Sequence, residues 1–212
     1  MPIKAKPVML ESGDRLTRAE FHRRYCLRPD IKRAELVGGV VYVPSPTRFS
    51  VHDRQHGDVV LWLGTYAMRH PDLRSGVDAT VMLDANNEVQ PDGFVFRVPP
   101  PDERAARVND EGYIEGAPQL VLEVAASSAS YDLHDKLRAY EQAGVQEYVV
   151  WRTLDEQVEW FRLGEGAYER VTPDERGVIE SHAFPGLRLH VAKLLSGDMA
   201  GVLAELDESA SR

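Results

Sequence analysis

Two acidic residues and one lysine, Asp92, Glu123 and Lys136, carry the clearest chemical signal in this sequence. Glu123 interrupts a continuous apolar run at residues 120–125, a pattern typical of a strand that is buried on both faces. A buried carboxylate costs free energy unless a partner compensates its charge, and a metal ion is one such partner. Two acids and a lysine beside a sheet are the minimum set of groups for metal-assisted cleavage of a phosphodiester bond.

The two acids occupy complementary places in their predicted strands. Asp92 stands at the start of one short apolar strand, and Glu123 stands near the end of another. If these strands are antiparallel neighbours, the start of one lies beside the end of the other, and the two carboxylates meet at one edge of the sheet. Carboxylate oxygens are the ligands that hard cations such as magnesium prefer.

Lys136 lies on the helix predicted to follow Glu123. We expect the sheet-facing side chains of this helix to be Leu133, Leu137 and Tyr140. At about 100° per residue, Lys136 lies roughly 40° from Tyr140, so it borders this stripe and its ammonium can turn towards the strand.

Several neighbouring residues are auxiliary candidates with ordinary alternatives. Glu35 interrupts an apolar strand, and His52 opens a long predicted helix. Asp132 is a third candidate. It is also explained as an acidic residue at a helix N-terminus, where the helix dipole favours negative charge, or as the partner of Lys136 in a surface ion pair one turn apart. The pair His52 and His56 lacks the glutamate of a zinc-protease helix, which excludes that class of site.

The pattern of apolar residues predicts strands with helices between them, and therefore an α/β or α+β fold with a mixed sheet flanked by helices. Thr17 and Glu20 form a helix capping box, and Gly38-Gly39 closes a β-hairpin over residues 34–43. We expect a single domain over residues 1–212, with loose ends at 1–14 and 200–212 and a polar loop at 98–118. The other expected elements are helices at 50–69 and 132–143 and strands at 77–83, 93–96, 120–125, 147–152, 158–163, 168–171 and 187–191.

Composition limits the function classes. The single cysteine, Cys26, excludes a disulfide within the chain, and the N-terminus lacks the apolar core of a secretory signal. These features predict a cytoplasmic protein without a membrane partner. The net charge of −9 argues against a nucleic-acid partner, but residues 1–50 hold ten Lys/Arg against five Asp/Glu. That segment therefore carries +5, which permits such a partner and equally fits a solvated basic surface.

The ordered set of motifs resembles the Uma-type restriction endonuclease family of the PD-(D/E)xK nuclease superfamily. In that superfamily the lysine usually stands two residues after the glutamate, where this chain has Ala125, whereas the Uma-type pattern takes its lysine from the next helix. The matching pieces are Glu35-Leu36-Val37-Gly38-Gly39, His52, Pro91-Asp92, Leu122-Glu123-Val124, Asp132 with Lys136 and Tyr140, Gly144-Val145-Gln146-Glu147-Tyr148, and Pro185-Gly186-Leu187-Arg188-Leu189.

This resemblance implies a restriction-endonuclease-like core and metal-dependent hydrolysis of DNA. Asp92 and Glu123 would hold magnesium or manganese, Lys136 would orient the attacking water, and Glu35 and His52 would assist. A homodimer would suit the cutting of two strands. Two alternatives stay open, namely a non-catalytic domain of the same fold that binds nucleic acid or protein, and a metal phosphoesterase acting on a small substrate.

Overall fold

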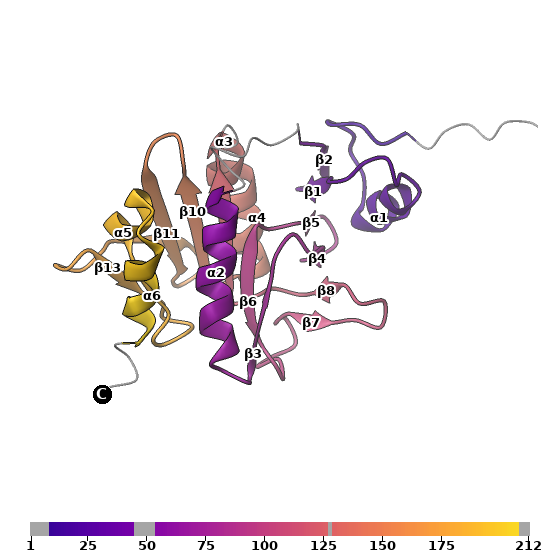
Figure 1. Cartoon of the computed structure of the whole chain (residues 1–212). Coiled ribbons are helices and arrows are strands. Elements are labelled where there is room, and N and C mark those ends of the chain that lie inside the picture. The colour runs from indigo at the N-terminus through magenta and orange to yellow at the C-terminus, as the bar shows by residue number, and fades with distance from the viewer. Residues whose placement is uncertain (1–8, 45–53, 127–128, 208–212) are drawn as a thin grey trace, which may run out of the picture.

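The computed structural model describes residues 9–44, 54–126 and 129–207, and Figure 1 shows their arrangement in two main sheets with helices around them. The central sheet has the strand order β12-β11-β10-β9-β6-β3, and a first sheet has the order β2-β1-β5-β4-β8-β7. The helices are α1 (Arg18–Cys26), α2 (Arg54–Met68), α3 (Ala129–Tyr131), the π-helical turn η2 (Asp132–Lys136), α4 (Leu137–Ala143), α5 (Val191–Ser196) and α6 (Met199–Asp207).

The central sheet is mixed. Its strands β9 (Leu120–Ala125) and β10 (Glu147–Arg152) are parallel, and all its other neighbouring pairs are antiparallel. The parallel pair needs a crossover, which the helical segment from α3 to α4 supplies. The remaining strands of this sheet are β3 (Leu73–Gly76), β6 (Gly93–Arg97), β11 (Gln157–Leu163) and β12 (Tyr168–Val171).

The first sheet stands beside the central sheet, on the right in Figure 1. Its hairpin of β1 (Glu35–Val37) and β2 (Val40–Tyr42) turns at Gly38 and Gly39, whose φ angles of 58° and 75° suit glycine, so the predicted hairpin is confirmed. The other strands are β4 (Val81–Met82), β5 (Glu88–Val89), β7 (Arg107–Val108) and β8 (Ile114–Glu115), and β13 (Val178–Glu180) pairs with β14 (Arg188–His190) in a separate ribbon.

Helices cover both faces of the central sheet (Figure 1). On one face, α2 and α6 pack against side chains of the central strands, among them Leu122 and Val124 of β9. On the other face, Ala139 and Tyr140 of α4 pack against Val121 of β9. Because alternate residues of a strand point to opposite faces, Glu123 faces the η2–α4 side together with Val121. This layering confirms the predicted mixed sheet flanked by helices.

Most predicted elements are present, and three predictions are wrong in detail. Residues 77–83 do not form one strand, because Asp78 has a φ of 50°. The chain passes at this point from β3 of the central sheet to β4 of the first sheet. The expected polar loop at 98–118 contains β7 and β8. The C-terminal segment is ordered as far as residue 207, because Val202 and Leu206 of α6 are buried against α2 and the sheet.

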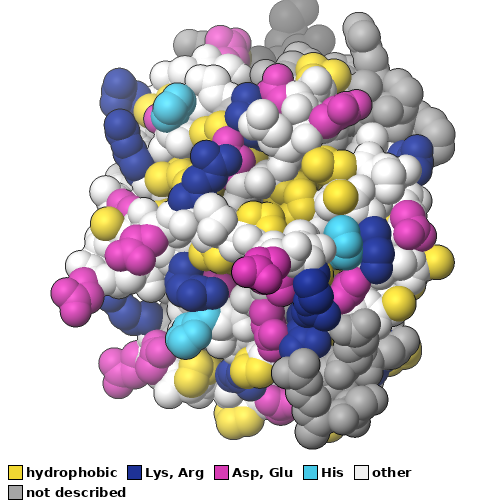
Figure 2. All heavy atoms as spheres, turned by 90° about the vertical axis from the view of Figure 1, so that its left-hand side faces the viewer, with side chains coloured by type: hydrophobic (Ala, Val, Ile, Leu, Met, Phe, Trp, Pro, Cys, Tyr) yellow, Lys and Arg dark blue, Asp and Glu magenta, His cyan; other side chains and the backbone are white. Residues whose placement is uncertain are grey.

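The surface of the molecule away from the first sheet has mixed charge. Figure 2 shows acidic, basic and apolar side chains interspersed over this face. The side chains that are described there do not form a surface of one sign. No helix in the described part of the chain combines the length and the apolar character that crossing a membrane requires.

Gly93 lets α2 approach the sheet directly beside Asp92. A Cβ atom at this position would lie 2.8 Å from Val59 Cγ1 and 2.9 Å from Leu63 Cδ1. We expect Gly93→Ala to lower the free energy of unfolding by about 1–3 kcal/mol, since it overpacks this contact. Urea unfolding measures the change. The control is Gly57→Ala on α2, where nothing lies within 4 Å of an added Cβ and stability should hold or rise. Equal stability of Gly93→Ala and the parent would contradict the packing argument.

Candidate active site

The register of β6 and β9 places Asp92 beside Glu123. The two strands are antiparallel with Gly93 opposite Leu122, so Asp92, one residue before β6, lies at the level of Glu123. The Asp92 side chain is 2 % exposed, and its Oδ2 accepts a hydrogen bond of 2.7 Å from the amide of Val124. The antiparallel geometry that we expected for these two acids is confirmed.

Glu123 is buried and receives two hydrogen bonds on the same oxygen. Lys136 Nζ lies 2.8 Å from Glu123 Oε1, and the hydroxyl of Tyr140 donates to that oxygen at 2.7 Å. Glu123, Lys136 and Tyr140 are each at most 2 % exposed. The reach of Lys136 towards Glu123, expected from the helical spacing, is therefore confirmed.

Lys136 is the last residue of a π-helical turn that lies between α3 and α4. The turn spans Asp132–Lys136, and both of its end residues are buried. The stripe facing the sheet is consequently formed by Asp132, Lys136, Ala139 and Tyr140, whereas the expected residues Leu133 and Leu137 are only half-buried. Single π-helical turns inside α-helices occur often at functional sites.

Glu35 joins the site from the first sheet. Its Oε1 lies 3.0 Å from Lys136 Nζ and accepts a hydrogen bond of 2.8 Å from the amide of Gln90. Asp132 Oδ1 lies 3.9 Å from the same Lys136 nitrogen. We call Glu35, Asp92, Glu123 and Asp132 the carboxylate cluster. The structure thus brings together every predicted site residue except His52, which lies outside the described residues.

Arg33 is a second cation at this site, and the sequence analysis gave it no role there. Its Nη1 lies 3.2 Å from Asp92 Oδ1 and 3.3 Å from Asp78 Oδ1, and its Nη2 donates to the carbonyl of Gln90. Its side chain is 26 % exposed to solvent, so the guanidinium lies between the buried acids and solvent.

His56 and Asp78 form the outer rim next to Asp92. His56 Nε2 lies 3.2 Å from Asp78 Oδ2, and this contact raises the pKa of His56 although partial burial opposes the shift. One ligand atom from each of His56, Asp78 and Asp92 lies within 4.8 Å of the others. The Asp78 side chain is 51 % exposed, so this rim opens the site to solvent.

The sequence holds only a weak signal for these additional residues. Arg33 lies two residues before Glu35. In an extended chain, residues two apart point to the same side, so the two side chains would share a face, but Arg33 itself lies before the start of β1. His56 lies one helical turn after His52, and Asp78 stands inside an expected strand where the positive φ could not be foreseen. The three residues meet Asp92 only through tertiary contacts.

The electrostatics of the site favour another cation. Among the residues that the structure describes, Arg33 contacts Asp92, and the ammonium of Lys136 lies within 4 Å of Glu35, Glu123 and Asp132. Burial raises the pKa of Glu123 to about 8; Lys136 opposes this shift, and the other carboxylates of the cluster add to it. Burial by itself would lower the pKa of Lys136, but the attraction of Glu123 and Glu35 outweighs it and the pKa is raised.

The same groups are chemically suited to a divalent metal ion. Carboxylate oxygens are the ligands that magnesium and manganese prefer. Asp92 belongs both to the carboxylate cluster and to the rim of His56 and Asp78. A doubly charged ion would offset the mutual repulsion of these buried carboxylates, which raises the pKa of Glu123.

Comparisons with known proteins agree with this architecture. The profile of the Uma2 family, described as “Putative restriction endonuclease”, matches residues 18–192. Among solved structures, a protein from Anabaena variabilis ATCC 29413, described as “a putative nuclease belonging to DUF820”, aligns with a TM-score of 0.58 and 17% sequence identity. The alignment covers 77% of this chain and 89% of that chain, and at this identity it shows a shared fold. A search of curated proteins found no match.

Proposed function

Since the chain belongs to the Uma2 family of restriction-endonuclease-type proteins, as the sequence resemblance predicted, we propose that it is a metal-dependent endonuclease that hydrolyses DNA. The observation that carries this proposal is the buried contact of Glu123 with Lys136 at the strand edge that also holds Asp92. A purely structural core would be more stable with apolar residues in these places, because buried ion pairs seldom repay their desolvation.

In this proposal Asp92 and Glu123 hold the metal ion, magnesium or manganese, with Glu35 as an additional ligand or as the partner of a metal-bound water. The bound ion would lower the pKa of a water molecule and offset the negative charge that develops on the phosphate. Asp132 and Tyr140 keep Lys136 and Glu123 in position, since they contact the ammonium and the carboxylate respectively.

Lys136 has the role of orienting the attacking water and stabilising the transition state. Its ammonium is fixed by two carboxylates, Glu35 and Glu123, at 3.0 and 2.8 Å, so it enters the reaction already positioned. Preorganised charges of this kind stabilise developing negative charge without reorganisation during the reaction. The raised pKa keeps Lys136 protonated at neutral pH.

Arg33 and His56 are the groups that a phosphate meets first. Both are partly exposed, at 26 % and 20 %, and both contact acids of the rim. A guanidinium binds phosphate oxygens through two parallel hydrogen bonds, so Arg33, at the solvent side of Asp92, would be suited to bind the scissile phosphate. A homodimer that presents two such sites to a duplex stays a prediction.

The proposal is tested by incubating supercoiled plasmid, single-stranded DNA and RNA with the pure protein. We expect nicking or linearisation of DNA with magnesium or manganese and no cleavage with EDTA. Cleavage of RNA alone would change the substrate class, and cleavage of a small phosphodiester alone would favour a phosphoesterase. Cutting that persists in EDTA, or no cutting and no metal binding by calorimetry, would overturn the catalytic assignment.

A further inference from the structure

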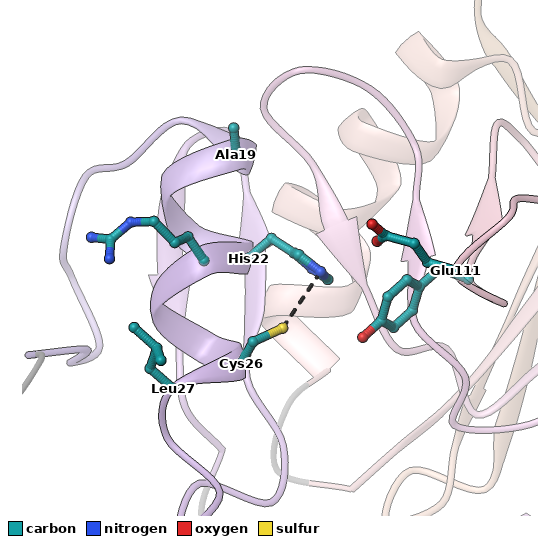
Figure 3. A pocket seen from close by; sticks show the side chains of 7 residues that line it. Ala19, His22, Cys26, Leu27 and Glu111 are labelled. Atoms are coloured by element: carbon teal, nitrogen blue, oxygen red, sulfur yellow. Dashed lines mark hydrogen bonds between the residues drawn. The ribbon is translucent and has the colours of Figure 1, made fainter.

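A second group of reactive side chains lies beside α1, apart from the carboxylate cluster. Figure 3 shows this depression, into which His22 points from α1 towards the segment that carries Glu111. Its volume is about 620 Å³, and a second depression of about 240 Å³ shares His22, Cys26 and Tyr113 with it. The only cysteine of the chain is therefore exposed at a site where several polar side chains meet.

Cys26, His22 and Glu88 form a chain of contacts across this depression. Cys26 Sγ lies 3.5 Å from His22 Nε2, and the other ring nitrogen, Nδ1, lies 2.8 Å from Glu88 Oε1. Cys26 and His22 are four residues apart on α1, so they occupy the same face of the helix. The ring of Tyr113 packs edge-on against His22 with 4.9 Å between the ring centroids, which fixes the plane of the imidazole.

The buried carboxylate of Glu88 defines which nitrogen of His22 is free to act as a base. Glu88 is 1 % exposed, and burial raises its pKa although His22 opposes the shift. Its Oε2 has no hydrogen-bond partner within the described structure, and Arg18 Nη1 lies 4.0 Å from it. When Glu88 is ionised, its best hydrogen bond is with an Nδ1–H of His22. Nε2 then carries the lone pair that faces the thiol.

This arrangement matches the general pattern of an activated nucleophile, in which a base touches the nucleophile and a third group orients the base. The cysteine is exposed, as reactive thiols are, and is not a buried core residue. A metal site is a poorer match, because no three potential ligand atoms of the described residues here lie within 4.8 Å of one another.

We propose that Cys26 is a modification site at which the thiol exchanges with the disulfide of a small thiol compound. His22 Nε2 takes the proton of Cys26, and the thiolate attacks one sulfur of the disulfide. A bond forms between Sγ and that sulfur, the original S–S bond breaks, and the departing thiolate takes the electron pair and the proton from His22. Cys26 is thereby oxidised to a mixed disulfide while half of the small disulfide is reduced to a thiol.

The lining suits a small compound with charges of both signs. Arg23 and Glu111 both line the depression, and the guanidinium of Arg23 also donates two hydrogen bonds of 2.8 Å to Glu20. A disulfide of an amino-acid-like thiol carries carboxylate and ammonium groups that these side chains can meet. The depression is open to solvent, which a reversible exchange requires.

The test measures how fast the full-length protein reacts with bis(2-hydroxyethyl) disulfide, with intact-mass spectrometry to count adducts. We expect one adduct, none with Cys26→Ser, and a rate at neutral pH about tenfold above that of N-acetylcysteinamide. His22→Gln should bring the rate down to that of the free thiol. The matched control, His70→Gln two residues beyond α2, should leave the rate unchanged.

Two results would overturn the proposal. One is a parent protein that reacts no faster than N-acetylcysteinamide, a comparison that does not depend on any variant folding. The other is a His22→Gln variant that is folded by circular dichroism and reacts as fast as the parent. Neither measurement involves nuclease activity, so the result for Cys26 does not depend on whether the proposed nuclease function is correct.

Discussion

Lys136→Met is expected to lower the free energy of unfolding by about 3–5 kcal/mol and to reduce DNA cleavage by at least about 100-fold. The stability loss follows because Lys136 is 2 % exposed and lies 2.8 and 3.0 Å from Glu123 and Glu35. Methionine fills a similar volume but leaves both buried carboxyl groups without the ammonium that they bind. Urea unfolding gives the first quantity, and plasmid nicking by the folded fraction gives the second.

The control for this experiment is Lys32→Met, which removes the same charge from an exposed position. Its unfolding free energy should stay within about 0.5 kcal/mol of the parent value. An unfolding midpoint for Lys136→Met equal to that of the parent would contradict the buried ion pair. Full cleavage by a folded Lys136→Met protein would contradict the catalytic role alone.

Glu123→Gln should become more stable relative to the parent as pH rises from about 5 to about 8. The pKa of Glu123 is raised from its ordinary value of 4.5 to about 8, so the folded parent keeps a proton that the unfolded chain has lost. Its stability therefore falls with increasing pH in this window, at up to about 1.4 kcal/mol per pH unit, and glutamine has no proton to lose. Thermal or urea unfolding of both proteins at several pH values measures the difference.

Magnesium provides an internal control for the pH experiment. A bound cation would replace the proton on Glu123, so the pH dependence of the stability difference should weaken at saturating magnesium. A difference between the two proteins that is flat from pH 5 to pH 8 without metal would contradict the raised pKa of Glu123.

The sequence predicted the strands that carry the acids and much of the framework around them. The apolar run of β9 has the predicted bounds, and Gly38-Gly39 and Gly144 mark a hairpin turn and a helix end, because their backbone conformations favour glycine. The strand predicted at 77–83 was wrong because one positive φ at Asp78 sends the chain to another sheet. Propensity and periodicity do not report such a local break.

For the candidate site, the predicted meeting of Glu123 and Lys136 is confirmed as a contact, and Asp92 lies at the level of Glu123 on the neighbouring strand. Arg33, His56 and Asp78 were not predicted at the site, because they have no periodic pattern and reach Asp92 through contacts between distant segments. The π-helical turn at Asp132–Lys136 also gave no signal, because a regular helix was the simplest reading of residues 132–143. The loose C-terminus expected from its polar composition was wrong as far as residue 207, since two apolar side chains, Val202 and Leu206, anchor α6.

The most direct test of the central claim is nicking of supercoiled plasmid in one magnesium buffer by the parent protein and by Asp92→Asn. Asp92 belongs to both groups of acids that could hold the metal, and asparagine keeps its shape while removing its charge. We predict metal-dependent nicking by the parent and a loss of at least about 100-fold in the variant, with both proteins folded. Equal nicking by the two proteins would contradict a metal-dependent nuclease centred on Asp92, Glu123 and Lys136.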